Sequence, residues 1–238
     1  MTATSPHAFW LSTPHQQAVE IALDLGCRTF VLDVEHGYFE LDATDKLVAL
    51  ILALGARVHA KVLGPETVAI QQMLVIGCSG VIIPHIGDAA HAARVCAASK
   101  YPGLGTRSFS GTRPARYDAV TPEYYSRQNA ETQCFPMVES AEALADIDAI
   151  LALPTVDGVF VGPSDLSLSR GRGAYMKTPA DFDDLRTIAA ACARAGKPWI
   201  MPAWSQVERD LATGLGAALL VTVDEYGAIW TGLERGLK

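Results

Sequence analysis

Ionisable side chains follow directly on an apolar run near the start of the chain. The stretch FVLDVEHGYFE spans residues 30–40 and places Asp33, Glu35 and His36 after three apolar residues. Carboxylates and imidazoles are the groups that most often act as general acids and bases in enzymes. The pattern therefore predicts a buried strand whose end carries reactive groups.

Three more ionisable side chains stand where later apolar runs end. RVHAKV ends near Lys61, QCFPMVE ends at Glu139, and Asp165 follows VDGVFVG. Two carboxylates on neighbouring strands can hold a hard divalent cation and leave positions open for a chelating 2-oxo acid. The alternative is that Glu139 and Asp165 only cap the helix or turn that follows each of them.

Side-chain alternation predicts which residues point inward. In RVHAKV, His59 and Lys61 share one face, while the small apolar residues share the other. The apolar face suits packing under helices, so His59 and Lys61 are expected to point into the interior of a barrel. His85 follows the run GVIIP and is open to two interpretations, a site residue or a contact with a neighbouring subunit.

Short apolar runs alternate with longer helical patterns along the whole chain. The expected strands are residues 8–11, 28–33, 57–62, 80–85, 133–139, 156–162, 198–202 and 217–223. The expected helices are residues 14–25, 41–54, 66–76, 88–99, 141–152, 180–195, 204–213 and 225–236. Eight such units predict a single-domain (β/α)8 TIM barrel over residues 1–238, with its active site at the carboxyl ends of the strands. The alternative is an open doubly wound sheet, but the first strand leads into STPHQQ, which is not a glycine-rich phosphate turn.

Composition excludes several classes of protein. A formal net charge of -7 argues against nucleic acid and anionic membranes as partners. The longest apolar run, residues 47–54, is far shorter than the roughly 20 residues that span a bilayer. Five scattered cysteines without a CxxC argue against a disulfide framework or a zinc site. Because no basic region precedes an apolar one at the start of the chain, we expect a cytoplasmic protein.

A long connection at residues 100–117 concentrates positive charge in an acidic protein. It contains Lys100, Arg107, Arg113 and Arg116 and no acidic residue. Arginine suits the recognition of carboxylates and phosphates, so this segment could form an anion-binding lip with Arg107 as its main candidate. The alternative is a solvated loop whose arginines make surface or subunit contacts.

Five motifs in consistent order resemble one enzyme family. FVLDVEHGYFE, GCSGVIIPHIGDAAHA, YPGLGTRSFS, PMVESAEAL and VDGVFVGPSDLS are similar to segments of the HpcH/HpaI aldolases, class II pyruvate-dependent enzymes. The resemblance implies a (β/α)8 barrel. It also implies a homo-oligomer, commonly a hexamer built from dimers that exchange their last helix. It also implies small-molecule 2-oxo acid and aldehyde substrates.

The resemblance also implies roles for individual residues. Glu139 and Asp165 match the metal ligands, His36 matches the catalytic histidine, and Asp33 matches its orienting carboxylate. Backbone amides of Ser164 and Asp165, in the turn that Gly162 begins, match the binding site of the pyruvate carboxylate. One position departs from the pattern, because Lys61 stands where the family usually has an arginine beside the keto oxygen; lysine keeps the charge and lacks the bidentate fork.

Together these features predict a metal-dependent carbon–carbon lyase. It would make or cleave a bond of a 4-hydroxy-2-oxo acid through a pyruvate-type enolate, with Mg²⁺, Mn²⁺ or Co²⁺ as cofactor. One alternative is a Schiff base on Lys61. Another is a lyase or synthase for citrate-like acids or CoA thioesters that uses the same metal–enolate chemistry. A third is a catalytically weakened relative that only binds a keto acid.

Overall fold

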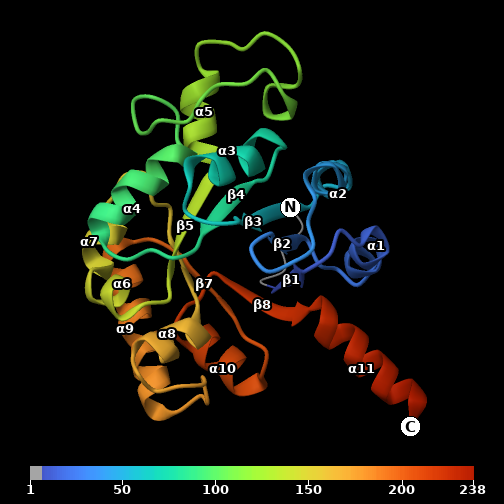
Figure 1. Cartoon of the computed structure of the whole chain (residues 1–238), viewed down its shortest axis with the longest axis vertical. Coiled ribbons are helices and arrows are strands. Elements are labelled where there is room, and N and C mark those ends of the chain that lie inside the picture. The colour runs from blue at the N-terminus through green and yellow to red at the C-terminus, as the bar shows by residue number, and fades with distance from the viewer. Residues whose placement is uncertain (1–6) are drawn as a thin grey trace.

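Eight parallel strands form a closed barrel in the order β1 to β8 (Figure 1). The computed structural model describes residues 7–238. The strands are β1 (His7–Leu11), β2 (Thr29–Asp33), β3 (Arg57–Lys61), β4 (Gly80–Ile83), β5 (Gln133–Val138), β6 (Val159–Val161), β7 (Trp199–Pro202) and β8 (Leu219–Asp224). The predicted single-domain (β/α)8 TIM barrel is therefore confirmed.

Helices cover the outside of the barrel and connect its strands. The α-helices are α1 (Gln16–Asp24), α2 (Leu41–Ala53), α3 (Thr67–Val75), α4 (Ala89–Cys96), α5 (Tyr124–Glu131), α6 (Ala141–Ala145), α7 (Ile147–Leu151), α8 (Pro163–Ser169), α9 (Pro179–Ala195), α10 (Gln206–Gly214) and α11 (Glu225–Leu237). Two 3₁₀ turns, η1 (Ala97–Ser99) and η2 (Arg113–Ala115), lie in the connection between α4 and α5.

The predicted strands and long helices occur within a few residues of their expected bounds, whereas two short helices were not predicted. Helix α8 begins at a proline and has only seven residues. Helix α5 has eight residues and only Tyr124 is buried. Neither gives the repeated apolar spacing by which a helix is recognised in a sequence. The predicted helix over residues 141–152 is divided at Asp146 into α6 and α7.

Two apolar layers hold the barrel together, one on each side of its wall. Inside the barrel, Val31, Ile82, Phe135, Met137 and Phe160 belong to one buried cluster. The much larger outer layer lies between the strands and the helices, and it includes Val58 and Ala60 of β3 and the next residue, Val62. The predicted alternation along β3 is confirmed, because His59 packs edge-on against the interior ring of Phe135.

His59 is a buried residue of the barrel interior. Its Nε2 lies 2.9 Å from Oε1 of Gln133, and its side chain is shielded from water. Burial lowers the pKa of His59 to about 4, because the imidazolium form would lose its hydration. The imidazole is therefore neutral near pH 7.

The last helix leaves the barrel instead of packing closely against it (Figure 1). Ile229, Trp230 and Leu233 on α11 are exposed, and Trp230 retains 74% of its accessible surface. Among residues 7–238 no helix combines the length and apolarity needed to cross a bilayer. The five cysteines are free thiols.

Candidate active site

A tight turn after β2 places the first group of reactive side chains. The backbone N–H of His36 donates to Oδ1 of Asp33 at 3.2 Å, and the N–H of Gly37 donates to the Asp33 carbonyl at 2.9 Å. A Cβ on Gly37 would lie 2.4 Å from the Asp33 carbonyl oxygen and 2.5 Å from that of Ser12. Only glycine fits this approach, so the turn fixes where His36 stands at the barrel rim.

Lys61 lies at the centre of this group. The register of β2 and β3 pairs Asp33 with Lys61, the last residue of each strand. Nζ of Lys61 lies 2.5 Å from Oε2 of Glu35, 3.5 Å from Oδ1 of Asp33 and 3.0 Å from Nδ1 of His36. The side chain of Lys61 is buried and inward, as its position in the strand predicted. Its charge is compensated by two carboxylates that are themselves buried.

Asp33, Glu35 and His36 are close enough together to form a metal-binding group. One ligand atom from each lies within 4.8 Å of the others. However, the ammonium of Lys61 contacts all three side chains and occupies the place that a cation would take. This group therefore already holds its counter-charge, and it fits a metal ion poorly.

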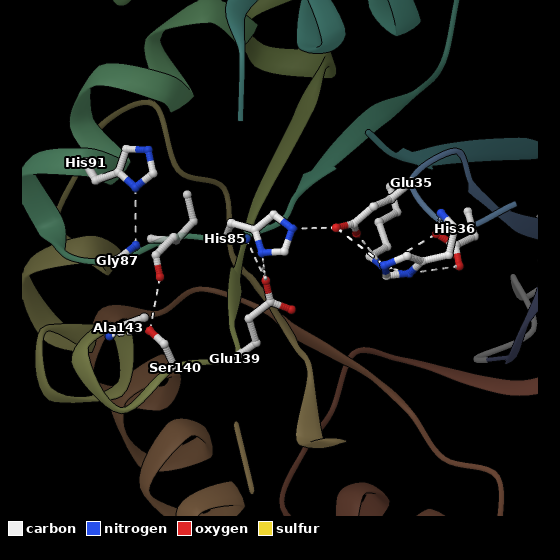
Figure 2. A network of polar contacts seen from close by, with 11 residues as sticks. Glu35, His36, His85, Gly87, His91, Glu139, Ser140 and Ala143 are labelled. Atoms are coloured by element: carbon white, nitrogen blue, oxygen red, sulfur yellow. Dashed lines mark hydrogen bonds and ion pairs between the residues drawn. The ribbon is translucent and has the colours of Figure 1, made fainter. Parts of the chain in front are cut away.

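His85 connects this group to Glu139 (Figure 2). Its Nε2 lies 2.5 Å from Oε1 of Glu35, and its backbone N–H donates to Oε1 of Glu139 at 2.6 Å. The backbone of His85 is left-handed, with φ at 60°, a conformation that costs a non-glycine residue about 1 kcal/mol or more. This strained residue contacts both Glu35 and Glu139.

Glu139 and Asp165 face a common cavity. This cavity has a volume of about 410 Å³, and its wall includes both carboxylates and the imidazole of His85. Burial raises the pKa of Glu139, and the negative charge of Asp165 raises it further. A Cβ on Gly162 would lie 2.8 Å from Cβ of Glu139 and 3.0 Å from Cε of Met137. Gly162 is therefore the residue that leaves room for the Glu139 side chain.

This pair of carboxylates fits a divalent cation. Both offer oxygen atoms, the ligands that Mg²⁺ and Mn²⁺ prefer, and neither forms an ion pair with a Lys or Arg side chain within residues 7–238. Glu139 is buried at the end of β5, whereas Asp165 is exposed in the first turn of α8. A cation between them would lower the repulsion that raises the Glu139 pKa.

The structure places the expected carboxylate-binding turn beside this pair. Gly162 precedes α8, and Ser164 and Asp165 are exposed in the first turn of that helix. Their backbone N–H groups belong to the helix start, where such groups have no partner within the helix. The predicted binding residues therefore stand at the same rim as Glu139.

The structure does not place Arg107 at this rim. The segment from α4 to α5 lies at the amino-terminal ends of the strands, because it follows a helix and leads into β5. There the Arg107 guanidinium donates to the Leu74 carbonyl at 3.3 Å and stacks over the ring of Tyr101 at 4.6 Å. Within this chain, the expectation that Arg107 contacts the substrate is wrong.

Two residues of the site had no firm role in the sequence-based interpretation. Glu35 was seen in the first motif but given no function, although it contacts Lys61, His85 and His36. The spacing D-x-E-H could have indicated a role for Glu35, because the turn after β2 brings Asp33 and Glu35 to the same group of side chains. The role of His85 depends on a left-handed backbone, which a histidine in a sequence does not reveal.

The fold and the site together define a class of protein, an enzyme with a parallel barrel whose reactive side chains gather at the carboxyl ends of the strands. A family model described as HpcH/HpaI aldolase/citrate lyase matches residues 7–213. The chain belongs to this family, as its motifs predicted, and it is therefore an enzyme of the aldolase and lyase type.

Named relatives agree with this assignment. The chain is 33% identical to a hydroxypyruvate/pyruvate aldolase of Pseudomonas aeruginosa, over 79% of this chain and 72% of the relative. It is 30% identical to a 4-hydroxy-2-oxovalerate aldolase of Novosphingobium aromaticivorans, over 80% and 72%. The crystal structure of an HpcH/HpaI aldolase from Desulfitobacterium hafniense DCB-2 superposes with a TM-score of 0.90 at 26% identity, covering 97% of this chain and 90% of that one.

Proposed function

We propose that the enzyme is a divalent-metal-dependent aldolase that makes or cleaves the carbon–carbon bond of a 4-hydroxy-2-oxo acid. The observation that carries this proposal is the joint exposure of Glu139 and Asp165 to one cavity, with His85 linking Glu139 to the Lys61 group. The similarity to aldolases of pyruvate and of 4-hydroxy-2-oxovalerate supports the same substrate class.

Glu139 and Asp165 would hold the metal, Mg²⁺, Mn²⁺ or Co²⁺. A bound divalent cation polarises the ketone of a 2-oxo acid that chelates it. The first-turn amides of Ser164 and Asp165 would receive the substrate carboxylate, since N–H groups at a helix start are free to bind an anion.

His36 would take and return the proton at the carbon next to the ketone, directly or through a water. Nδ1 of His36 accepts a hydrogen bond from the Lys61 ammonium, which can only donate, so neutral His36 carries its proton on Nε2. A substrate keto oxygen that attracts the Lys61 ammonium would release Nδ1 to act as base. Asp33 holds the turn in place and its Oδ2 lies 3.8 Å from the same nitrogen.

Lys61 fits this role better than that of a Schiff-base nucleophile. Nζ of Lys61 contacts two carboxylates, and attack on a ketone would require it to give up both contacts. The positive charge lies beside the developing oxyanion, where it lowers the barrier to proton removal. Borohydride treatment in the presence of pyruvate should therefore leave Lys61 unmodified.

The test is the exchange of pyruvate methyl protons in D₂O, followed by NMR, because it needs no aldehyde. Exchange should require added metal, stop with EDTA and return with Mg²⁺, Mn²⁺ or Co²⁺. Glu139→Gln should abolish exchange while Glu142→Gln, an exposed carboxylate on the same cavity, should retain it. Full exchange after removal of the metal would refute the proposal.

We also propose that the last helix is exchanged between subunits. A groove of about 520 Å³ lies between α1, β1, β8 and the start of α11, and its wall includes Phe9, Ile21 and Leu25. The apolar face of a second α11 would fill it and bury Trp230. Light scattering should show an oligomer that Trp230→Lys dissociates, whereas an oligomer unaffected by Trp230→Lys would contradict the exchange.

A further inference from the structure

A second cavity lies at the opposite end of the barrel from the candidate active site. It has a volume of about 300 Å³. It is bordered by the start of β3, by the turn before β4 and by the residue before β5, all at the amino-terminal ends of these strands. Its polar lining includes Arg57, Arg107, Arg113, Ser79 and Thr132.

Arg107 forms part of this lining as a buried cation without an acid. The side chain is 4% exposed, and no carboxylate within residues 7–238 forms an ion pair with it. Its hydrogen bonds, to the Leu74 carbonyl at 3.3 Å and Oγ1 of Thr132 at 3.4 Å, are long, and its Nε has no partner among the described residues. A buried charge of this kind is costly until an opposite charge approaches it.

Two further guanidinium groups border the same cavity. Arg57 is exposed and donates to Oε1 of Gln133 at 2.9 Å, which leaves most of its five donors free for other partners. Arg113 contacts Asp45 at 2.7 Å, and its stem crosses Gly77, where a Cβ would lie 3.2 Å from Cδ of Arg113. The acid on the wall, Glu131, is exposed.

We propose that this cavity is a binding site for a phosphate group, supplied by inorganic phosphate or by a small phosphate ester. After Asp45 and Glu131 are counted against the three arginines, the lining keeps a surplus of one positive charge, which favours a bound phosphate anion. Guanidinium groups bind phosphate oxygens in pairs, and the hydroxyls of Ser79 and Thr132 add neutral donors. The volume admits the phosphate and a few further atoms.

The test is isothermal calorimetry of the full-length enzyme, loaded with metal, against inorganic phosphate and against glycerol 3-phosphate. Arg57→Gln and Arg113→Gln should each weaken binding about tenfold, the loss of one charged hydrogen bond. Glu139→Gln should leave binding unchanged, and Arg57→Gln should leave pyruvate proton exchange unchanged. These controls separate this site from the proposed metal site.

Each outcome decides the proposal. Tighter binding of glycerol 3-phosphate identifies an ester as the ligand class, and tighter binding of inorganic phosphate identifies the free ion. Absence of binding, binding that Arg57→Gln does not weaken, or binding that Glu139→Gln abolishes would each overturn the proposal. Tighter binding of citrate than of either phosphate would overturn the assignment to phosphate. Because Arg57 is exposed, its variant tests the site without a risk to folding.

Discussion

Each end of the barrel buries cationic side chains, and two of them, Lys61 and Arg107, are partnered in opposite ways. At the carboxyl end, Lys61 contacts Asp33, Glu35 and His36 within 3.5 Å. At the amino-terminal end, Arg107 is equally buried but stacks on Tyr101 and finds no carboxylate among the described residues. One charge is satisfied within the chain and the other is not.

Whether a buried cation has a carboxylate partner within the chain affects how readily it can bind an external anion. A cation such as Lys61, which is already paired with carboxylates, can contact a substrate only if the substrate replaces one of those contacts. An uncompensated cation such as Arg107 can bind an external anion without first breaking an ion pair. The carboxyl end therefore suits chemistry and the amino-terminal end suits binding.

The largest effect should come from His36→Ala. Removal of a general base lowers the rate of proton transfer by about 10²–10⁴-fold, so pyruvate methyl exchange in D₂O should fall by that factor. Arg57→Gln, at the other end, is the matched control and should exchange at the parent rate. Comparable losses in both variants would break the distinction between the two ends.

Paired variants of the two buried cations should sharpen the comparison. Lys61→Met leaves Asp33 and Glu35 buried without a counter-charge and should reduce the free energy of unfolding by roughly 3–5 kcal/mol. Arg107→Met leaves no acid behind and loses two long hydrogen bonds and the stack on Tyr101, so it should cost about 1–2 kcal/mol, less than Lys61→Met. Urea unfolding measures both, and an equal cost would contradict the assignment of charges.

The barrel interior between the two ends should make stability depend on pH. The pKa of His59 falls from 6.5 in the unfolded chain to about 4 in the fold, so the unfolded state binds a proton first. Its contribution is fully present above pH 6.5 and is lost as the pH falls toward 4. Between pH 7 and pH 5 the free energy of unfolding should drop by about 2 kcal/mol from this group. His59→Gln should remove that part of the pH dependence, and an unchanged dependence would refute it.

The smallest effect should come from the residue that joins the two halves of the carboxyl end. His85→Gln keeps a side-chain donor toward Glu35 and should retain the exchange rate within about threefold. His85→Gly keeps the backbone N–H on Glu139 and relieves the left-handed strain, but it lacks the donor and should lower kcat about tenfold. The slower variant, His85→Gly, should be no less stable to heat than His85→Gln, because it alone relieves the strain. Equal rates would show that the Glu35 contact does not position the site.

Much of the fold follows from local pattern. Alternating apolar runs and helical patterns gave the strand order, and the alternation in RVHAKV correctly pointed His59 and Lys61 inward. Helix α8 was not predicted, because Leu166 is the main apolar residue that this short helix buries. The proposed metal pair, Glu139 and Asp165, came from residues at predicted strand ends and from the family motifs. The proposed roles of His36 and Asp33 came from the family motifs.

Other features depend on contacts between distant segments. The link from Glu35 through His85 to Glu139 joins residues that are fifty positions or more apart, and no spacing encodes it. The position of Arg107 was predictable from topology alone. A segment that follows a helix and precedes a strand must lie at the amino-terminal end of a parallel barrel. The positive charge of this segment led to the prediction that it binds an anion at the active site. Its place between a helix and a strand instead indicates the amino-terminal end of the barrel.

The close approach of Gly162 to Glu139 has a consequence for anyone who wishes to alter substrate preference by randomising this rim. Every replacement at that position introduces a carbon that competes with the carboxylate for the same space, so most members of such a library would be inactive. Ser164, two positions along and facing solvent, offers variety without that penalty. Tolerance to substitution in this loop therefore differs sharply between Gly162 and Ser164, two positions apart.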